Sequence, residues 1–376
     1  MKKPAIFLSL ILSISGLNIH AQKLQNLNYG KFKVGFQSNL VTDFSRPSRE
    51  KPMMGRNIQI NIWYPARIKS ETAVRIRNYI ELEGQEDRKG ISKRQNDSTY
   101  LEFLSNLIIG GADSLEVHSF FKKDFKTIAF HNASILNNEY PVVLLMHGSA
   151  FQYMLMGQFL ASNGFIAINI PYKGYLQNQF DVSILGMETE IRDIEFALTS
   201  MIQKMNLTVK NIGLVEYSFG GQSAVGLAVR NPLVKGIVSL DGGIGSDFGP
   251  KLLERFPFFK MDKILQPVMH LYNPHDKGGN IKWFDQAIFN NNYLIALDNM
   301  EHGFFGSFGW LDRYIPHVFG KNFNRVGNNP EIILKASLTF LEHCFKTDFI
   351  QSFNLKSINW MNRNIILEDF RAKSNG

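Results

Sequence analysis

The chain has 376 residues, of which 44% are hydrophobic, 12% aromatic and 20% charged, and its formal net charge is +8. This composition is typical of a globular protein with a sizeable core, and it excludes a disordered or fibrous chain. A single cysteine excludes an intrachain disulfide and a thiolate metal cluster. Because Cys344 lies in a helical apolar pattern, we expect it in the core rather than acting as a nucleophile.

Residues 1–21 have the pattern of a secretory signal peptide. Two lysines are followed by an apolar run over 5–17, and the small residue Ala21 ends the segment. The run is shorter than the roughly 20 residues that span a bilayer, which argues against a retained membrane anchor. We therefore expect cleavage after Ala21, a secreted or periplasmic protein, and no integral membrane segment in the mature chain.

The positive charge does not indicate a nucleic-acid partner. Removal of 1–21 takes away two lysines and no acidic residue, which leaves 39 basic against 33 acidic residues, or +6. The densest charged stretch, 86–94, mixes both signs and is typical of a solvated loop. No basic patch with interleaved aromatic residues is present, so nucleic-acid binding is not predicted.

The first part of the mature chain predicts two strands and an insertion. Residues 57–65 alternate polar and apolar side chains, which indicates a half-buried strand, and 41–47 form an earlier strand and turn. Residues 67–135 lack such clear strands and look like a partly helical insertion. The predicted domain therefore covers 22–346 with this insertion, and a tail follows over 347–376.

Short apolar runs follow from residue 141 onward. Such runs, separated by helical patterns such as 187–204, predict a mostly parallel sheet with helices on both faces. Ligands bind at the carboxyl ends of the strands in sheets of this kind. The runs are 142–146, 165–170, 212–215, 236–240, 268–272 and 293–297.

A candidate nucleophile follows the third run. There, Glu216-Tyr217-Ser218-Phe219-Gly220-Gly221 leads from a strand into a helical stretch, which is the context of a nucleophile elbow. Ser218 is the predicted nucleophile and Gly220 meets the need for a small residue after it. Glu216 stands where the G-x-S-x-G motif has glycine. Without the preceding strand, the same residues would equally fit an ordinary helix start.

A serine nucleophile needs a histidine base and an acid that orients it. His302 follows the last apolar strand and is the predicted base. Asp241 follows the run at 236–240 and Asp276 follows the run at 268–272, so both are candidate acids. The chain order Ser–Asp–His holds for either.

The developing oxyanion needs two N–H donors. They are predicted to come from Phe219, directly after the nucleophile, and from Ser149 in the loop after the first apolar run, where His147 shapes a turn. No metal-ligand spacing and no phosphate-cradling glycine loop is present, so neither a metal nor a cofactor is predicted.

Taken together, these segments resemble the platelet-activating-factor acetylhydrolases and their bacterial dienelactone-hydrolase-like relatives. The resemblance covers roughly 30–66 and 138–345, and it implies an α/β-hydrolase fold and cofactor-free hydrolysis of short acyl esters. Glu216 departs from the family pattern, and 67–135 has no counterpart in it. The segments that carry the resemblance are 34–35, 43–47, 55–56, 62–66, 147–151, 160–166, 218–221 and 240–241.

The resemblance also implies roles for the site residues. The nucleophile falls on Ser218, the base on His302, the acid on Asp241 rather than Asp276, and the oxyanion donors on Ser149 and Phe219. The predicted protein is a secreted serine ester hydrolase acting on small-molecule or lipid esters with short acyl groups, including phospholipid sn-2 acetyl-type esters. Residues 67–135 would form a lid. The alternative is a hydrolase-fold binding protein whose activity is impaired by the glutamate at the elbow.

Overall fold

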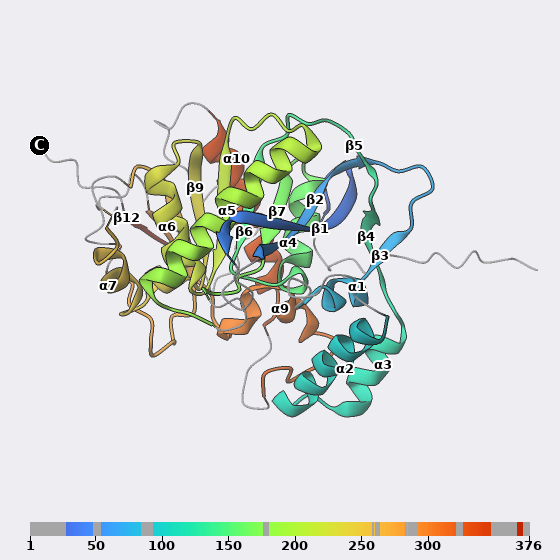
Figure 1. Cartoon of the computed structure of the whole chain (residues 1–376). Coiled ribbons are helices and arrows are strands. Elements are labelled where there is room, and N and C mark those ends of the chain that lie inside the picture. The colour runs from blue at the N-terminus through green and yellow to red at the C-terminus, as the bar shows by residue number, and fades with distance from the viewer. Residues whose placement is uncertain are drawn as a thin grey trace, which may run out of the picture.

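A twelve-stranded mixed sheet forms the centre of the computed structural model (Figure 1). The structure describes residues 28–47, 54–83, 93–175, 180–257, 259, 264–282, 284, 292–320, 326–346 and 367–370. The predicted signal peptide and most of the predicted tail lie outside these ranges. The strands are β1 (Lys33–Pro47), β2 (Gly55–Arg67), β3 (Ala73–Arg75), β4 (Lys126–His131), β5 (Ser134–Ile135), β6 (Val142–Met146), β7 (Ile166–Ile170), β8 (Ile212–Tyr217), β9 (Val234–Leu240), β10 (Val268–Tyr272), β11 (Asn292–Ala296) and β12 (Leu367–Phe370).

The strand order is β12-β11-β10-β9-β8-β6-β7-β2-β1-β4-β3, with β5 paired to β2. Strands β7, β6, β8, β9, β10 and β11 run parallel, while β2 joins β7 and β12 joins β11 in antiparallel fashion. The predicted mostly parallel sheet is therefore confirmed. All six apolar runs form strands of this parallel part.

Helices cover both faces of the sheet, as predicted. The helices are α1 (Ile76–Glu81), α2 (Lys93–Gly110), α3 (Ser114–Lys122), α4 (Ala150–Ser162), α5 (Ile184–Met205), α6 (Gly220–Arg230), α7 (Gly249–Glu254), α9 (Ser307–Leu311) and α10 (Asn329–Phe345), with short 3-10 turns η1 (Gly243–Gly245) and η3 (His302–Phe305).

Alternate residues of each central strand enter two separate cores. In β6, Val143 and Leu145 belong to the core beneath α4 and α10, whereas Leu144 and Met146 belong to the core beneath α5 and α6. Because both faces are covered, β6 is apolar at every position rather than alternating. Cys344 is buried on α10, as expected.

The expectation of a half-buried strand at 57–65 is wrong, because β2 is buried along most of its length. It lies between β1 and β7, and α4 packs against it. The polar residues Gln59 and Asn61 are 3% and 0% exposed. They hydrogen-bond to other protein groups, since the Gln59 Nε2 donates to Asn61 Oδ1 at 3.0 Å.

Residues 67–135 contain helices α1 to α3 and also β3, β4 and β5, which the sequence pattern did not indicate. β4 pairs in parallel with β1 and antiparallel with β3, so the region extends the sheet. Helices α2 and α3 lie at one end of the molecule (Figure 1). Phe103 of α2 attaches them to the domain through ring contacts with Phe151 of α4 and Phe308 of α9, at 5.0 Å and 5.9 Å between ring centroids.

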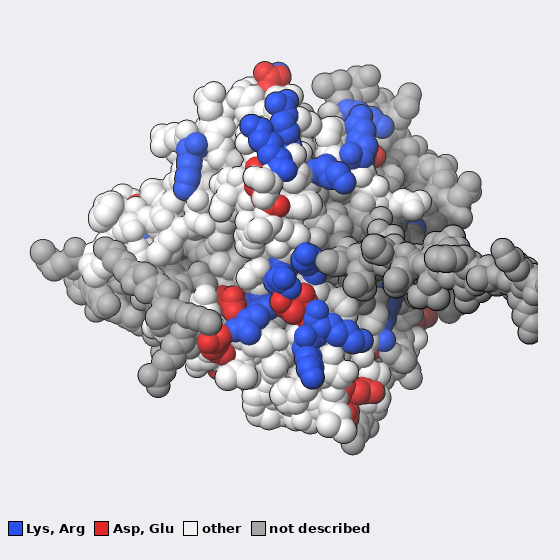
Figure 2. Space-filling model, turned by 90° about the vertical axis from the view of Figure 1, so that its right-hand side faces the viewer, with Lys and Arg blue, Asp and Glu red and all other residues white. Residues whose placement is uncertain are grey.

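Charges of both signs are mixed on one face of the molecule (Figure 2). On the face drawn in Figure 2, lysine and arginine side chains lie beside acidic ones and are separated by uncharged residues. In the part of the chain that the structure describes, no helix is both long enough and apolar enough to cross a bilayer.

Candidate active site

The candidate site lies where the parallel strands β6, β8 and β9 end side by side. Met146 of β6 is in register with Glu216 of β8, and Tyr217 of β8 is in register with Leu240 of β9. The loops that follow these strands therefore start next to one another at one edge of the sheet. They carry Ser149, Ser218 and Asp241.

Ser218, His302 and Asp241 form one hydrogen-bonded series. The Ser218 Oγ lies 2.8 Å from His302 Nε2, and His302 Nδ1 lies 2.6 Å from Asp241 Oδ2. The His302 side chain is 51% exposed, whereas that of Asp241 is 11% exposed. The ring of Tyr217 stacks on one face of the imidazole, with 4.7 Å between the ring centroids. This is the arrangement in which a serine hydroxyl loses its proton to an oriented histidine.

Asp276, the other candidate acid, lies in an exposed turn over 273–279. Its Oδ1 accepts a hydrogen bond from the Gly278 N–H at 3.0 Å. Within the described ranges it forms neither a hydrogen bond nor an ion pair with a histidine. The structure therefore brings Asp241, and not Asp276, against His302.

The turn at Ser218 has the tight geometry of an elbow. Ser218 has a φ of +57°, in the left-handed region that residues other than glycine rarely adopt. A Cβ on Gly220 would lie 2.7 Å from the Cβ of His147, so only glycine allows the loop after β6 to approach so closely. His147 itself has a φ of +60°. The predicted need for glycine at 220 thus has a direct steric cause.

Glu216 fits at the elbow because the next turn leaves room for it. Its side chain is 0% exposed, and a Cβ on Gly242 would lie 2.1 Å from Glu216 Oε1. The Ser239 hydroxyl lies beside the carboxyl, yet within the described part of the chain neither Glu216 oxygen accepts a hydrogen bond of acceptable geometry. Gly242, directly after Asp241, therefore makes space for Glu216, two residues before Ser218.

Burial raises the pKa of the Glu216 carboxyl well above its usual range. The Ser239 hydroxyl acts in the opposite direction, and the carboxylates of Glu190 and Asp241 add to the rise. Burying a charge without a partner is costly, so this environment favours the neutral acid. The raised pKa therefore works against a full negative charge on Glu216 close to Asp241.

The two predicted oxyanion donors lie at helix starts. Ser149 is the N-cap of α4, where its hydroxyl accepts from the Gln152 N–H at 3.2 Å, and Phe219 precedes α6. Among the described residues, no acceptor takes a hydrogen bond from the backbone N–H of Ser149 or Phe219. Helix N-termini favour negative charge, so both donors are available for a developing oxyanion.

A cavity of about 150 Å³ adjoins Ser149. Four rings form a cluster on one side of it, with the His147 and Tyr172 rings 4.7 Å apart and Phe180 and Phe219 packed against them. The remaining wall includes polar and apolar groups. The lining residues are Gln59, Leu82, Glu83, His147, Gly148, Ser149, Ala150, Pro171, Tyr172, Lys173 and Phe180.

A buried arginine holds the loop that forms part of this wall. Arg56 Nε and Nη2 each lie 2.7 Å from a carboxylate oxygen of Asp193, and Arg56 Nη2 also donates to the Gly174 carbonyl at 2.8 Å. Arg46 reaches the same carboxylate at 2.9 Å. Because this bidentate pair is shielded from water, it fixes the backbone beside Tyr172 and Lys173.

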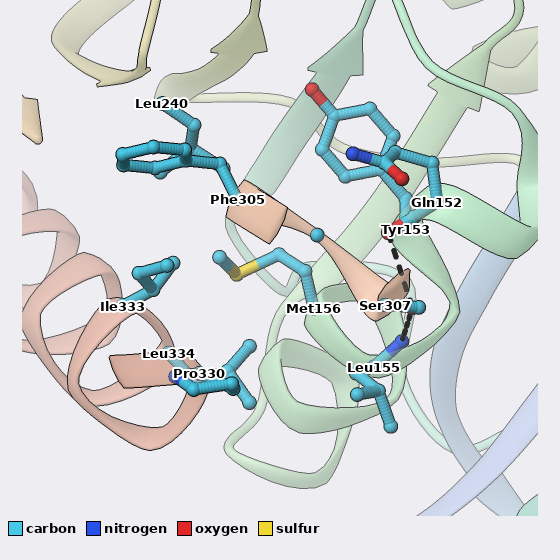
Figure 3. A pocket seen from close by; sticks show the side chains of 11 residues that line it. Gln152, Tyr153, Leu155, Met156, Leu240, Phe305, Ser307, Pro330, Ile333 and Leu334 are labelled. Atoms are coloured by element: carbon cyan, nitrogen blue, oxygen red, sulfur yellow. Dashed lines mark hydrogen bonds between the residues drawn. The ribbon is translucent and has the colours of Figure 1, made fainter. Parts of the chain in front are cut away.

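A second cavity, of about 20 Å³, is too small for an acyl group. Figure 3 shows that apolar side chains surround it, including Leu240, Phe305 and Met156. Ser307 Oγ links its two walls, since it donates to the Gln152 carbonyl at 3.1 Å and accepts from the Leu155 N–H at 3.4 Å. Its lining includes Leu240, the residue before Asp241, and Phe305, three residues after His302.

Sequence reasoning missed two buried polar residues of the sheet that are linked to the loop carrying Ser149. Asn169 and Asn61 are both 0% exposed and lie opposite each other in β7 and β2. A lone asparagine in the apolar run 165–170 is the signal that points to such a residue. In the described ranges, no three His, Cys, Asp or Glu side chains form a group that could hold a metal ion.

No family model and no curated protein sequence matches the chain. Among solved structures, a ferulic acid esterase from Streptomyces cinnamoneus is similar, with a TM-score of 0.57 and 17% identity over 85% of this chain and 91% of that chain. Est1E from Butyrivibrio proteoclasticus has a TM-score of 0.38 and 12% identity over 55% and 89%. An acylaminoacyl peptidase from Pyrococcus horikoshii has a TM-score of 0.41 and 14% identity over 59% of this chain and 39% of that chain.

The first of these likenesses, together with the sheet order, confirms the predicted α/β-hydrolase fold. The resemblance to the platelet-activating-factor acetylhydrolases and the dienelactone-hydrolase-like proteins stays a prediction.

Replacing Glu216 with Gln should change how stability depends on pH. Below the pKa of the unfolded chain, the carboxyl is neutral in both states and its contribution to stability is fully present. As pH rises from there through the raised folded pKa, the unfolded chain ionises more readily than the folded one, and this contribution is lost. Glutamine has no such loss. The stability gained by Glu216→Gln over wild type should therefore grow above about pH 5, by up to about 1.4 kcal/mol per pH unit.

Urea unfolding at pH 5, 7 and 9 measures this difference. The exposed Glu254 provides the control, since Glu254→Gln should give a curve parallel to that of wild type. Parallel curves for Glu216→Gln as well would contradict a neutral carboxyl at this position.

Proposed function

We propose that this chain is an exported serine ester hydrolase that cleaves short-acyl carboxylic esters through an acyl-enzyme. The observation that carries the proposal is the hydrogen-bonded series from Ser218 through His302 to Asp241, with distances of 2.8 Å and 2.6 Å. Its occurrence at the carboxyl ends of the strands of an α/β-hydrolase fold adds support.

In the first step, the Ser218 Oγ attacks the ester carbonyl carbon while His302 Nε2 takes the hydroxyl proton. Asp241 keeps the imidazole oriented through Nδ1 and stabilises the imidazolium that forms. The carbonyl oxygen becomes an oxyanion, which accepts hydrogen bonds from the N–H groups of Ser149 and Phe219.

Collapse of the tetrahedral species breaks the bond to the alcohol oxygen, and the imidazolium of His302 gives its proton to that oxygen. The acyl group is then an ester of Ser218. Water attacks this ester while His302 again takes a proton, and the carboxylic acid leaves as the Ser218 hydroxyl is restored.

The size of the cavity beside Ser149 supports a small acyl group. Its volume of about 150 Å³ is below the roughly 300–1,000 Å³ of sites that hold drug-sized ligands. The proposed substrates are small-molecule or lipid esters with a short acyl chain, including phospholipid sn-2 acetyl-type esters. In this proposal the mature protein is secreted or periplasmic.

A fluorophosphonate probe should label the folded mature protein at Ser218, and Ser218→Ala should abolish the labelling. In a series of p-nitrophenyl esters from acetate to dodecanoate, kcat/KM should be highest for the shortest acyl chains because the cavity is small. Methyl ferulate extends the series, since one structurally similar protein is a ferulic acid esterase. An absence of labelling would overturn the proposed chemistry, and a maximum at long chains would overturn the proposed substrate class.

Replacing Asp241 with Asn should lower kcat about 10³- to 10⁴-fold, because the amide no longer holds the imidazole in the required tautomer. Asp276→Asn is the matched control and should stay within about threefold of wild type, since the hydrogen bond that its carboxylate accepts comes from the backbone of its own turn and not from a histidine. Steady-state kinetics on p-nitrophenyl acetate measures both variants. The reverse order of effects would assign the acid to Asp276.

The alternative of an impaired binding protein rests on Glu216 at the elbow. If Ser218 is functional as proposed, Glu216→Gly should not gain activity, because it opens a void between the turns at Ser218 and Gly242. We expect kcat to fall while the protein remains folded by circular dichroism. An inert wild type together with an active Glu216→Gly variant would instead support the alternative.

A further inference from the structure

A chain of buried amides runs from the edge of the cavity to the loop that carries Ser149. The Gln59 Nε2 donates to Asn61 Oδ1 at 3.0 Å, and Asn61 Nδ2 donates to Asn169 Oδ1 at 3.0 Å. The Asn169 Nδ2 then donates to two backbone carbonyls, those of Leu145 at 3.1 Å and Gly148 at 2.8 Å. The three amide side chains are between 0% and 3% exposed.

The direction of this chain is fixed at its end beside Ser149. Two carbonyl oxygens can only accept, so the amide end that faces them must be the NH₂ of Asn169. Its oxygen therefore accepts from Asn61, whose own oxygen then accepts from Gln59 and from the Ser38 hydroxyl at 2.8 Å. Reversing any one amide would set like groups against each other in a buried site.

The bond to Gly148 also orients the N–H of the next residue. The C=O of Gly148 and the N–H of Ser149 belong to one planar trans peptide, and they point in opposite directions. Because the Gly148 carbonyl points toward Asn169 of β7, the Ser149 N–H points away from that strand. Among the described residues it has no acceptor.

We infer that Asn169 is a positioning residue for the oxyanion donor at Ser149, held in turn by Asn61 and Gln59. This inference rests on the ester hydrolysis proposed above. Without the bond from Asn169, the Gly148–Ser149 peptide can rotate, because Gly148 has no side chain to restrict it. An N–H that is not fixed in advance stabilises the oxyanion less, since the reaction must then orient it.

The test compares Asn169→Leu with Asn292→Leu. Leucine is close to asparagine in size and cannot donate a hydrogen bond. Asn292 is a matched control because it is also buried, at 2% exposure, and donates to a backbone carbonyl from the first residue of β11, away from the carboxyl edge. Both variants lose one buried amide, but only Asn169→Leu loses the contact with Gly148.

The kinetics on p-nitrophenyl acetate should separate positioning from general damage. For Asn169→Leu we expect kcat to fall about 10- to 100-fold, with KM within about threefold and an unchanged pH midpoint. The inhibition constant of a trifluoromethyl ketone, whose serine adduct carries an oxyanion, should rise by the same factor. Asn292→Leu should match wild type in both measurements.

Each outcome decides the matter. Equal kcat and inhibition constants for folded Asn169→Leu and wild type would overturn the inference and leave the proposed function intact. A wild type that hydrolyses no ester would overturn both. If Asn169→Leu does not fold, Asn169→Ser, whose hydroxyl is too short to replace the amide, is subject to the same expectations and the same refutation.

Discussion

The hydrogen bond from the Gly243 N–H to the Ser218 carbonyl, 2.7 Å long, joins the turn after β8 to the turn after β9. Both turns contain a residue in the left-handed region, Ser218 at φ +57° and Asp241 at φ +49°. Such residues cost about 1–3 kcal/mol each, so the surrounding structure must hold them in place. The shared bond fixes the nucleophile and the acid relative to each other, and one imidazole can then contact both.

Polar groups buried in the sheet serve this edge in two different ways. The amides of Gln59, Asn61 and Asn169 are linked donor to acceptor, which compensates for the loss of water and gives the loop after β6 a single arrangement. Glu216 has no such partner within the described ranges, and its environment favours the neutral acid instead. The linked amides orient a backbone peptide, whereas the Glu216 carboxyl fills the space beside Gly242 in an environment that works against its charge.

The sequence pattern predicted the parallel strands well, because a strand covered on both faces is mostly apolar and does not alternate. It failed at β2, where alternation suggested a surface that faces water. Gln59 and Asn61 are polar for a different reason, since they bond to one another and, through Asn169, to the loop at Ser149. The spacing of polar residues in a strand does not tell whether water or another protein group forms their hydrogen bonds. The strands in 67–135 escaped detection because they are only 3, 6 and 2 residues long, too short to show a clear pattern.

The sequence by itself determined the order of the elements, the serine in a strand–turn–helix context and the histidine after the last parallel strand, because these depend on local patterns. It left Asp241 and Asp276 equal on spacing, and only the resemblance favoured Asp241. Tertiary structure brought Asp241 to 2.6 Å from His302 and left Asp276 in an exposed turn. It also decided that a glutamate fits before the nucleophile, because the room for it comes from Gly242, a residue on another strand's turn. Contacts between residues far apart in the chain depend on packing, which no local pattern encodes.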